Sequence, residues 1–233
     1  MKMSKLTKSL IAGSVFLVSG SAMAAGVYDT KHNLSSSGSG TIKSTDQSEI
    51  CVFCHTPHDA IKNNNIPLWN HSLSSVASYG VYQSPTMNAA DLTDVGTGGD
   101  ITKVAVSNLC LSCHDGTVAI NSFNNPSNMS PTTTMVGTAG GKLPAGNSNL
   151  GTDLTNDHPV NFTYNTALAT ADGTLRDPVT ASGSGLTNGA KLFNGKLHCA
   201  SCHDPHSSAD PSGKAFLRGS MTNSALCMGC HLK

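Results

Sequence analysis

Cysteine and histidine recur together in this sequence as C-x-x-C-H. Four such motifs use all eight cysteines of the chain. They comprise Cys51, Cys54 and His55, then Cys110, Cys113 and His114, then Cys199, Cys202 and His203, and finally Cys227, Cys230 and His231. In this motif the two thiols add across the vinyl groups of a haem to form thioethers, and the histidine binds the iron as an axial ligand. The spacing therefore predicts four covalently attached c-type haems.

Other uses of paired cysteines fit the pattern less well. Eight cysteines could form four disulfides in an exported protein, but a disulfide framework does not require a histidine after each cysteine pair. A structural zinc ion takes four ligands, which leaves the repeated histidine unexplained. A redox-active C-x-x-C is expected beside a βαβ pattern, which the loop-rich surroundings of these motifs do not show.

The second axial position of each iron needs a ligand as well. Methionine is one alternative, but histidine is in surplus, and this favours bis-histidine ligation. Six histidines outside the motifs are available, namely His32, His58, His71, His158, His198 and His206.

An internal repeat narrows this choice. Residues of about 25–130 and 150–233 each hold one early histidine, one C-x-x-C-H-x-P-H and one plain motif, which suggests two duplicated two-haem halves in a single domain, 25–233. His71 and His198 fall outside the repeat. We expect His198 at the surface and keep His71 as a weaker candidate ligand. The repeat selects His32, His58, His158 and His206 as the distal ligands.

His58 follows the first attachment motif closely. Because His55 lies beneath its own haem, a residue three positions later stays on the same side of the ring, and the segment is too short to pass around the porphyrin rim. The same reasoning applies to His206, which follows His203. We therefore predict that each of these two side chains binds the iron of a different haem or binds none.

The first residues of the chain predict export. Residues 1–24 have a basic start, a short apolar run and a small-residue site around Ala22-Met23-Ala24, which are the features of a cleaved signal peptide. The apolar run is too short to span a bilayer, which needs about 20 apolar residues. Removal of this segment leaves 11 basic and 14 acidic side chains. The resulting net charge of −3 does not favour binding to nucleic acid.

The stretches between the motifs predict little regular structure. Only 12% of residues are charged and 5% aromatic, so the chain has too few large apolar side chains for an ordinary core. Short helices are expected at 44–50, where Ser44 and Gln47 have capping-box spacing, at 190–197 and at 220–227. We predict a mostly irregular fold with a few short helices, organised around four stacked covalent haems.

Six short segments carry a family resemblance. They are 31–34 (KHNL), 51–58 (CVFCHTPH), 67–70 (PLWN), 110–116 (CLSCHDG), 157–160 (DHPV) and 199–206 (CASCHDPH). Together they resemble the exported tetrahaem c-type cytochromes of metal-reducing bacteria, in particular the filament-forming outer-membrane cytochrome E type. The resemblance extends over nearly the whole chain after residue 24, and the segments are specific as a set although each is short.

This resemblance implies a row of closely stacked bis-histidine haems that continues into the next subunit of a homopolymer. In these cytochromes one haem takes an axial histidine from a neighbouring subunit, and by motif position that role falls on His58. The resemblance further implies an extracellular or outer-membrane location, redox partner cytochromes, and external acceptors such as Fe(III) or Mn(IV) oxides.

Electron transfer without bond chemistry is the predicted function. An iron with both axial positions occupied has no place for a substrate, so we expect the protein not to be an enzyme. Two alternatives remain open. A monomeric periplasmic shuttle would use the same haems without polymerising, and a multihaem reductase would need an open axial position.

Overall fold

Irregular backbone dominates the fold, as the sequence predicts. The computed structural model describes residues 26–62, 66, 68–92, 94–98, 100, 104–126, 133–180, 183–207 and 216–232. In these residues the helices and strands are short, and turns and bends join them. The predicted signal peptide lies outside the described residues.

The helices of the described residues are fixed by local capping. They are α1 (Val106–His114), α2 (Thr166–Asp172) and α3 (Cys199–Cys202), with 3₁₀ turns η1 (Cys51–Phe53), η4 (Thr222–Ser224) and η5 (Cys227–Gly229). At the start of α1 the Ala105 N–H donates to the side-chain oxygen of Asn108 at 2.6 Å. At the start of α2 the Asn165 side chain accepts from the Leu168 N–H at 2.9 Å. Gly173 ends α2 with a φ of 71°.

Two-residue strands join distant parts of the chain. β1 (Lys43–Ser44) pairs antiparallel with β3 (Met135–Val136), β2 (Gly80–Val81) parallel with β4 (Asp153–Leu154), β5 (Phe162–Thr163) antiparallel with β8 (Lys196–Leu197), and β6 (Val179–Thr180) antiparallel with β7 (Gly183–Ser184). Strands this short carry no alternating hydrophobic pattern, so sequence inspection does not find them.

The helix predicted at 44–50 is wrong. Ser44 Oγ does accept a hydrogen bond from the Gln47 N–H at 2.9 Å, as a capping box requires. The backbone nevertheless forms β1 and a turn, because Ser44 pairs with Met135 of β3. Tertiary pairing overrides the local signal here, since a serine side chain that caps a turn stabilises non-helical backbone as well.

The two helices predicted in the C-terminal part are also wrong. At 190–197 the residues Asn194 and Gly195 have φ values of 51° and 72°, which a tight hairpin turn requires and an α-helix excludes. At 220–227 the residues Asn223 and Ser224 also take positive φ, of 52° and 57°. This region therefore forms the separate turns η4 and η5 instead of an α-helix.

Buried apolar side chains of the described residues form three small clusters instead of one core. The clusters consist of Tyr79, Val95, Leu111 and Leu154, then Phe162, Tyr164, Leu168 and Leu197, and finally Val52 and Phe53. Each cluster includes or packs against a residue of an attachment motif. Clusters of this size cannot by themselves stabilise a chain this long, so the motifs are the places where further apolar material is needed.

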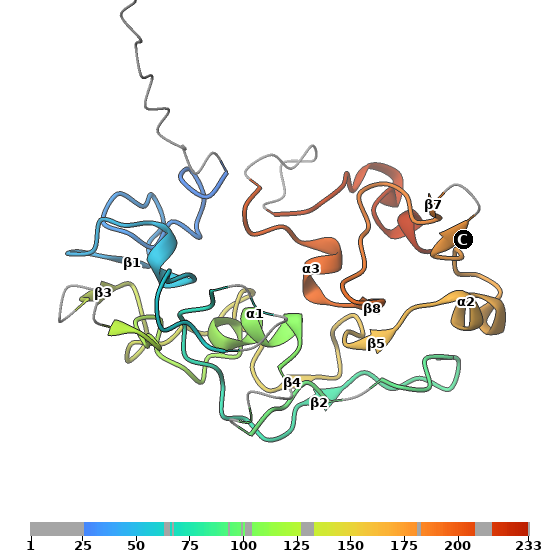
Figure 1. Cartoon of the computed structure of the whole chain (residues 1–233), viewed down its shortest axis with the longest axis horizontal. Helices are drawn as coiled ribbons and strands as arrows, with labels where there is room; N and C mark the ends of the chain where they lie inside the picture. Colours follow the sequence, from blue (N-terminus) through green and yellow to red (C-terminus); the bar gives the residue numbers. More distant parts are fainter. Residues whose placement is uncertain are drawn as a thin grey trace, which may run out of the picture.

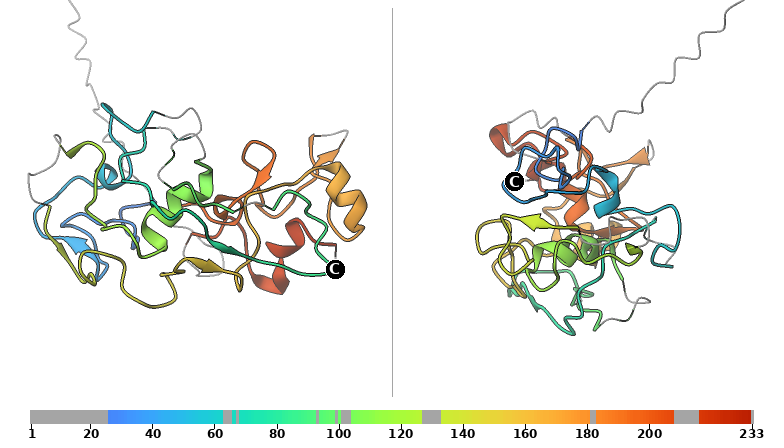
Figure 2. Two further views of the ribbon diagram at one scale, coloured as in Figure 1. Left: turned by 90° about the horizontal axis from the view of Figure 1, so that it is seen from below. Right: turned by 90° about the vertical axis from the view of Figure 1, so that its left-hand side faces the viewer.

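The attachment motifs follow one another along the long axis of the molecule. In Figure 1 the cyan turn η1 lies to the left, α1 and α3 lie at the centre, and the red C-terminal turns lie to the right. Figure 2 shows the same order from below. Across the described part of the chain, no helix has the length and apolar character needed to cross a membrane.

Candidate haem-binding sites

Each C-x-x-C-H forms a tight helical turn. In three motifs the histidine N–H donates to the carbonyl of the first cysteine, at 2.8 Å for His55, 3.1 Å for His203 and 2.9 Å for His231. The second motif instead forms the C-terminal part of α1, which ends at His114. A turn of this kind brings two thiols and one imidazole together, as attachment of one haem through three side chains requires.

Most of the thiols lie in apolar surroundings. Burial raises the pKa of Cys54 to about 11, of Cys113 to about 12 and of Cys230 to about 11. Cys51 and Cys227 are exposed. A cysteine pair that presents apolar surface at a partly open position suits the edge of a porphyrin.

Neighbouring motifs lie next to each other in sequence order. A hydrogen bond or an electrostatic interaction joins Cys54 to Cys113, Cys110 to Cys199, and Cys202 to Cys227. The contact between the second and third motifs brings α1 against α3 at the centre of Figure 1. The motifs therefore form a row from first to fourth, an order that the sequence alone does not provide.

Three pairs of histidines lie at the separation that a shared iron requires. An iron held between two imidazoles by bonds of about 2 Å places the ring centroids roughly 6 Å apart. The measured centroid distances are 6.0 Å for His55 and His206, 6.0 Å for His32 and His114, and 6.4 Å for His158 and His231. At these positions the residues present fit a bis-histidine haem.

Every pair combines one motif histidine with one predicted distal histidine. His206, which the sequence predicts not to serve the haem of its own motif, lies beside His55 of the first motif. The ring planes of this pair are inclined by 17°, whereas the pairs of His32 and of His158 have angles of 75° and 74°. The two imidazole planes are thus nearly parallel at the first site and nearly perpendicular at the other two.

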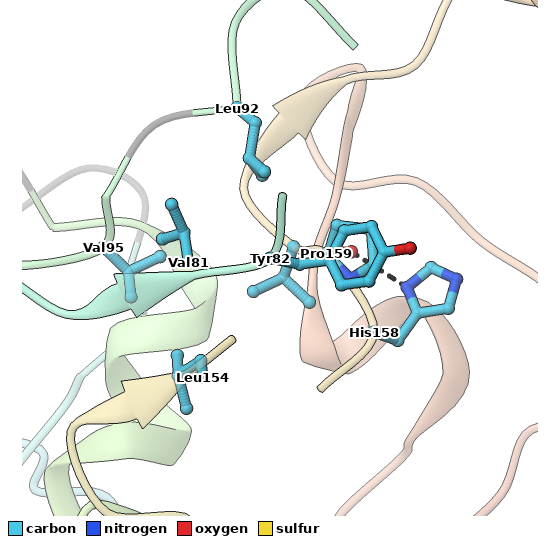
Figure 3. Close-up of a pocket in the computed structure, with 8 residues that line it drawn as sticks. Val81, Tyr82, Leu92, Val95, Leu154, His158 and Pro159 are labelled. Atoms are coloured by element: carbon cyan, nitrogen blue, oxygen red, sulfur yellow. Dashed lines mark hydrogen bonds between the residues drawn. The ribbon is translucent and has the colours of Figure 1, made fainter. Parts of the chain in front are cut away.

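Backbone carbonyls orient two of these imidazoles. Nδ1 of His114 lies 2.7 Å from the Ser148 carbonyl oxygen, and Nδ1 of His158 lies 2.9 Å from the Pro159 carbonyl oxygen, the bond drawn in Figure 3. Because a carbonyl only accepts, each Nδ1 carries the proton. Nε2 then keeps its lone pair, which is the form that binds a metal.

Apolar side chains accompany His158. Figure 3 shows its imidazole at the edge of a pocket lined by Val81, Tyr82, Leu92, Val95, Leu154, Pro159 and Val160. The lining of this pocket is apolar. Pro159 follows His158 directly, and a proline biases the residue before it towards extended backbone.

His32 is held in place by an aromatic stack. Its ring lies 4.2 Å from that of Phe216, with the planes inclined by 24°. Burial, and after it the neighbouring His114, lowers the pKa of His32 to about 4, so the ring is neutral at neutral pH. Its Nδ1 is buried without a hydrogen-bond partner among the described residues, and a buried polar atom of this kind needs a ligand or partner.

His58 and His203 are not paired in this way. Neither ring stacks on another aromatic ring of the described residues, and both side chains are exposed. The carbonyl oxygen of His58 accepts from Thr56 Oγ1 and from Asn125 Nδ2, both at 2.8 Å. The backbone of His58 is therefore fixed while its imidazole remains open to solvent.

The two histidines outside the repeat have other partners. His71 is 1% exposed, with Nδ1 at 2.9 Å from the Ser72 carbonyl and Nε2 at 3.0 Å from the Ala119 carbonyl. Neither nitrogen faces another histidine. His198, which the sequence predicts at the surface, is instead 4% exposed, and its Nδ1 lies 3.0 Å from Ser107 Oγ of α1. The surface prediction is wrong because the packing of α3 on α1 buries the residue that precedes Cys199.

The comparison with protein families concerns the C-terminal part of the chain. Residues 191–233, which contain the third and fourth motifs, match a family described as a doubled CXXCH motif. The match indicates a multihaem c-type cytochrome. Haem c is therefore the covalently bound cofactor of these cysteines, and four copies of it remain the prediction from the motif count. No curated protein matches the chain.

Three of the attachment motifs are held by the same two hydrogen bonds. Asn70, Arg218 and Arg176 each donate their backbone N–H to the carbonyl of the second motif cysteine, at 2.8, 2.8 and 2.7 Å. We call these three the clamp residues. Their side chains donate a further bond to the carbonyl of the residue after the first motif cysteine, from Asn70 Nδ2 to Val52 at 2.8 Å, from Arg218 Nε to Ala200 at 2.7 Å and from Arg176 Nε to Met228 at 2.7 Å.

The residue before each clamp residue pairs with the motif histidine. The isolated bridges join Trp69 to His55, Leu217 to His203, and Leu175 to His231. Each clamp thus fixes the backbone of both the attachment turn and its iron ligand. The second motif obtains the same rigidity from α1 and from a bond between the Leu150 N–H and the His114 carbonyl at 2.7 Å.

Sequence reasoning missed the clamp residues, although part of the signal is present. Asn70 lies 15 residues after His55, and Arg218 lies 15 residues after His203, so both belong to the internal repeat. Arg176 precedes its motif by more than 50 residues, and only the fold brings it to Met228.

Proposed function

We propose that this protein is a tetrahaem electron carrier whose copies join into an extracellular filament. Electrons pass along a row of bis-histidine haems towards external acceptors such as Fe(III) or Mn(IV) oxides, and redox partner cytochromes exchange electrons with the row. Bound haem supplies the one-electron Fe(III)/Fe(II) couple. The chain provides attachment, axial ligands and a fixed order of sites.

The observation that carries the proposal is the row of motifs with its histidine pairs. Neighbouring motifs interact through their cysteines, and three of the motif histidines have a second histidine at 6.0 to 6.4 Å. Filling both axial positions leaves no place for a substrate, and it keeps the ligand set the same in both oxidation states. This arrangement favours electron transfer over bond chemistry.

Two histidines without a partner histidine support the proposal of a polymer. His203 makes no ring contact with a second histidine among the described residues, and His58 has an exposed ring on a fixed backbone. We assign His58 of one copy to the iron held by His203 of the next. Such a contact uses two different surfaces, and a heterologous contact that does not close into a ring builds a filament.

The open position beside His203 is also what a multihaem reductase would use. A small ligand could bind there in an isolated chain, as catalytic metal sites generally allow. The two readings differ in what fills this position in the secreted protein. A histidine from another copy makes the iron low-spin and insensitive to added anions, whereas a substrate site stays open.

Substitution of His58 by alanine tests the assignment. We expect unchanged covalent haem content, loss of filaments in electron micrographs, and one high-spin haem in the absorption and EPR spectra. Lys62, an exposed residue a few positions later, provides the matched control, because Lys62→Ala should leave both filaments and spectra unchanged. Intact filaments with unaltered low-spin haems in His58→Ala would refute the role of His58.

Two further measurements separate the alternatives. Addition of cyanide or nitrite to the purified wild-type protein should not change its ferric spectrum, and a spectral change at one haem would support a reductase. Fractionation of cells with haem staining should place the protein outside the cell, whereas a monomer confined to the periplasm would support the shuttle.

A further inference from the structure

The clamp residues make the same hydrogen bonds but carry different charges. Asn70 is neutral, whereas Arg218 and Arg176 bear permanently charged guanidinium groups. The sequence contains no other arginine. Both arginines of the protein are therefore used at the attachment turns of the third and fourth motifs.

The two arginines also differ from each other. Arg218 Nη1 lies 2.9 Å from Asp204 Oδ2, so its charge is partly offset by a carboxylate. Arg176 forms no ion pair with any described residue. Its backbone carbonyl accepts the Tyr164 hydroxyl at 2.9 Å, and the same hydroxyl lies 3.2 Å from the Cys230 carbonyl, so the arginine is packed against the fourth motif. Among the described residues, no carboxylate forms an ion pair that offsets the charge at this motif.

The second motif has the opposite charge. Asp115, directly after His114, is 3% exposed and accepts from the Tyr79 hydroxyl at 2.5 Å and from the Thr117 N–H at 2.8 Å. These bonds stabilise a carboxylate in a buried position beside an iron ligand. The first motif has neither an anion of this kind nor an arginine clamp.

Fixed charges of this kind act on the redox couple of a nearby iron. Reduction adds an electron, so a cation stabilises the reduced form and an anion stabilises the oxidised form. Buried or partly buried charges are screened little by salt. Charge at the attachment turns therefore changes the order in which the haems accept electrons.

We propose that the clamp residues and Asp115 grade the potentials along the row, with the lowest potential at the second motif and the highest at the fourth. The haem held by Cys227 and Cys230 is then reduced first, and electrons run downhill from the N-terminal pair of haems to the C-terminal pair. Arg176 acts as a positioning residue with a second, electrostatic role. This inference rests on the proposed electron-transfer function.

Two substitutions of Arg176 separate its charge from its hydrogen bond. Arg176→Gln removes the charge and keeps an amide donor, as Asn70 has at the first motif. Arg176→Lys keeps the charge and loses the planar guanidinium group. The assay is a spectroelectrochemical titration of the holoprotein, followed by EPR at stepped potentials. In Arg176→Gln the reduced-to-oxidised ratio of the fourth haem at a fixed potential should fall on the order of tenfold, and Arg176→Lys should restore it.

The reciprocal substitution keeps the test decisive if Arg176→Gln fails to fold. Asp115→Asn removes the charge at the second motif with little change in side-chain size, so the potential of the second haem should shift upwards while the other haems stay unchanged. Unaltered potentials in an intact, low-spin Arg176→Gln or Asp115→Asn protein would overturn the inference, as would a wild-type titration in which the fourth haem is not reduced first. None of these results affects the proposed function, which fails instead if the wild-type protein lacks low-spin haem c.

Discussion

Substitution of His206 by alanine examines the pairing of ligands most directly. His206 lies 6.0 Å from His55, and the two ring planes are inclined by only 17°. If this pair holds the first haem, the substitution removes one of eight axial ligands and converts one haem of four to a high-spin or weakly ligated form. About a quarter of the low-spin intensity should then disappear.

The geometry also predicts which signal is lost. Nearly parallel imidazole planes give a rhombic low-spin ferric EPR spectrum, whereas perpendicular planes give a broad signal with one large g value. The pairs of His32 and His158 have angles of 75° and 74°, so they belong to the second type. We therefore expect EPR of the ferric His206→Ala protein to lose the rhombic signal and to retain the broad ones.

A control and a refutation follow from the same structure. His71→Asn changes a histidine whose nitrogens meet two backbone carbonyls and the Cys113 thiol instead of a second histidine, so it should leave every spin state unchanged. Loss of a broad signal in His206→Ala, or retention of the rhombic signal at full intensity, would show that His206 does not share an iron with His55.

Other predictions concern stability. Tyr79→Phe removes a buried hydroxyl donor to the Asp115 carboxylate and should lower the free energy of unfolding by about 1–3 kcal/mol, measured by urea denaturation of the holoprotein. Asn70→Ala leaves two buried backbone groups unpaired and should lower the free energy of unfolding by about 2–4 kcal/mol in the same assay. A loss under about 0.5 kcal/mol, which is typical of a surface substitution, would contradict the role of Asn70 as a clamp residue. Hydrogen bonds from the Ser44 hydroxyl and, after it, from the Thr134 N–H lower the pKa of the Asp46 carboxyl below its usual 3.8. These bonds stabilise the fold above pH 3.8, and the stabilisation is lost as the pH falls through the lowered pKa. The protection factor of the Thr134 amide against hydrogen exchange should fall below about pH 4 in the wild type, and Asp46→Asn should abolish this pH dependence of the protection factor.

The chemistry of attachment was readable from the sequence because it is local. Cysteine spacing and the adjacent histidine define a c-type haem site within five residues, and the doubled-motif match of 191–233 supports this interpretation. Composition likewise predicted the irregular backbone, since a chain with few large apolar residues cannot form a continuous core. The internal repeat identified three distal histidines that the structure places opposite motif histidines.

Predictions from local sequence signals were wrong where a tertiary contact competed with the local preference of the chain. The capping-box spacing at Ser44 was real, yet pairing with β3 prevented a helix. The Asn194-Gly195 dipeptide outweighed the helical pattern around it by adopting positive φ. His198 was buried by the packing of α3 on α1, which no feature of its own sequence neighbourhood reveals.

The sequence by itself determined the four C-x-x-C-H motifs and the set of candidate second ligands, because residue types and their spacing along the chain are local information. Only the tertiary structure decided that His206 lies beside His55, that the motifs form a row in chain order, and that Arg176 lies against the fourth motif. These relations join residues tens of positions apart, and they depend on turns and short bridges that leave no periodic pattern. For this reason the charge at each attachment site, and the order of potentials that we infer from it, follows from the fold.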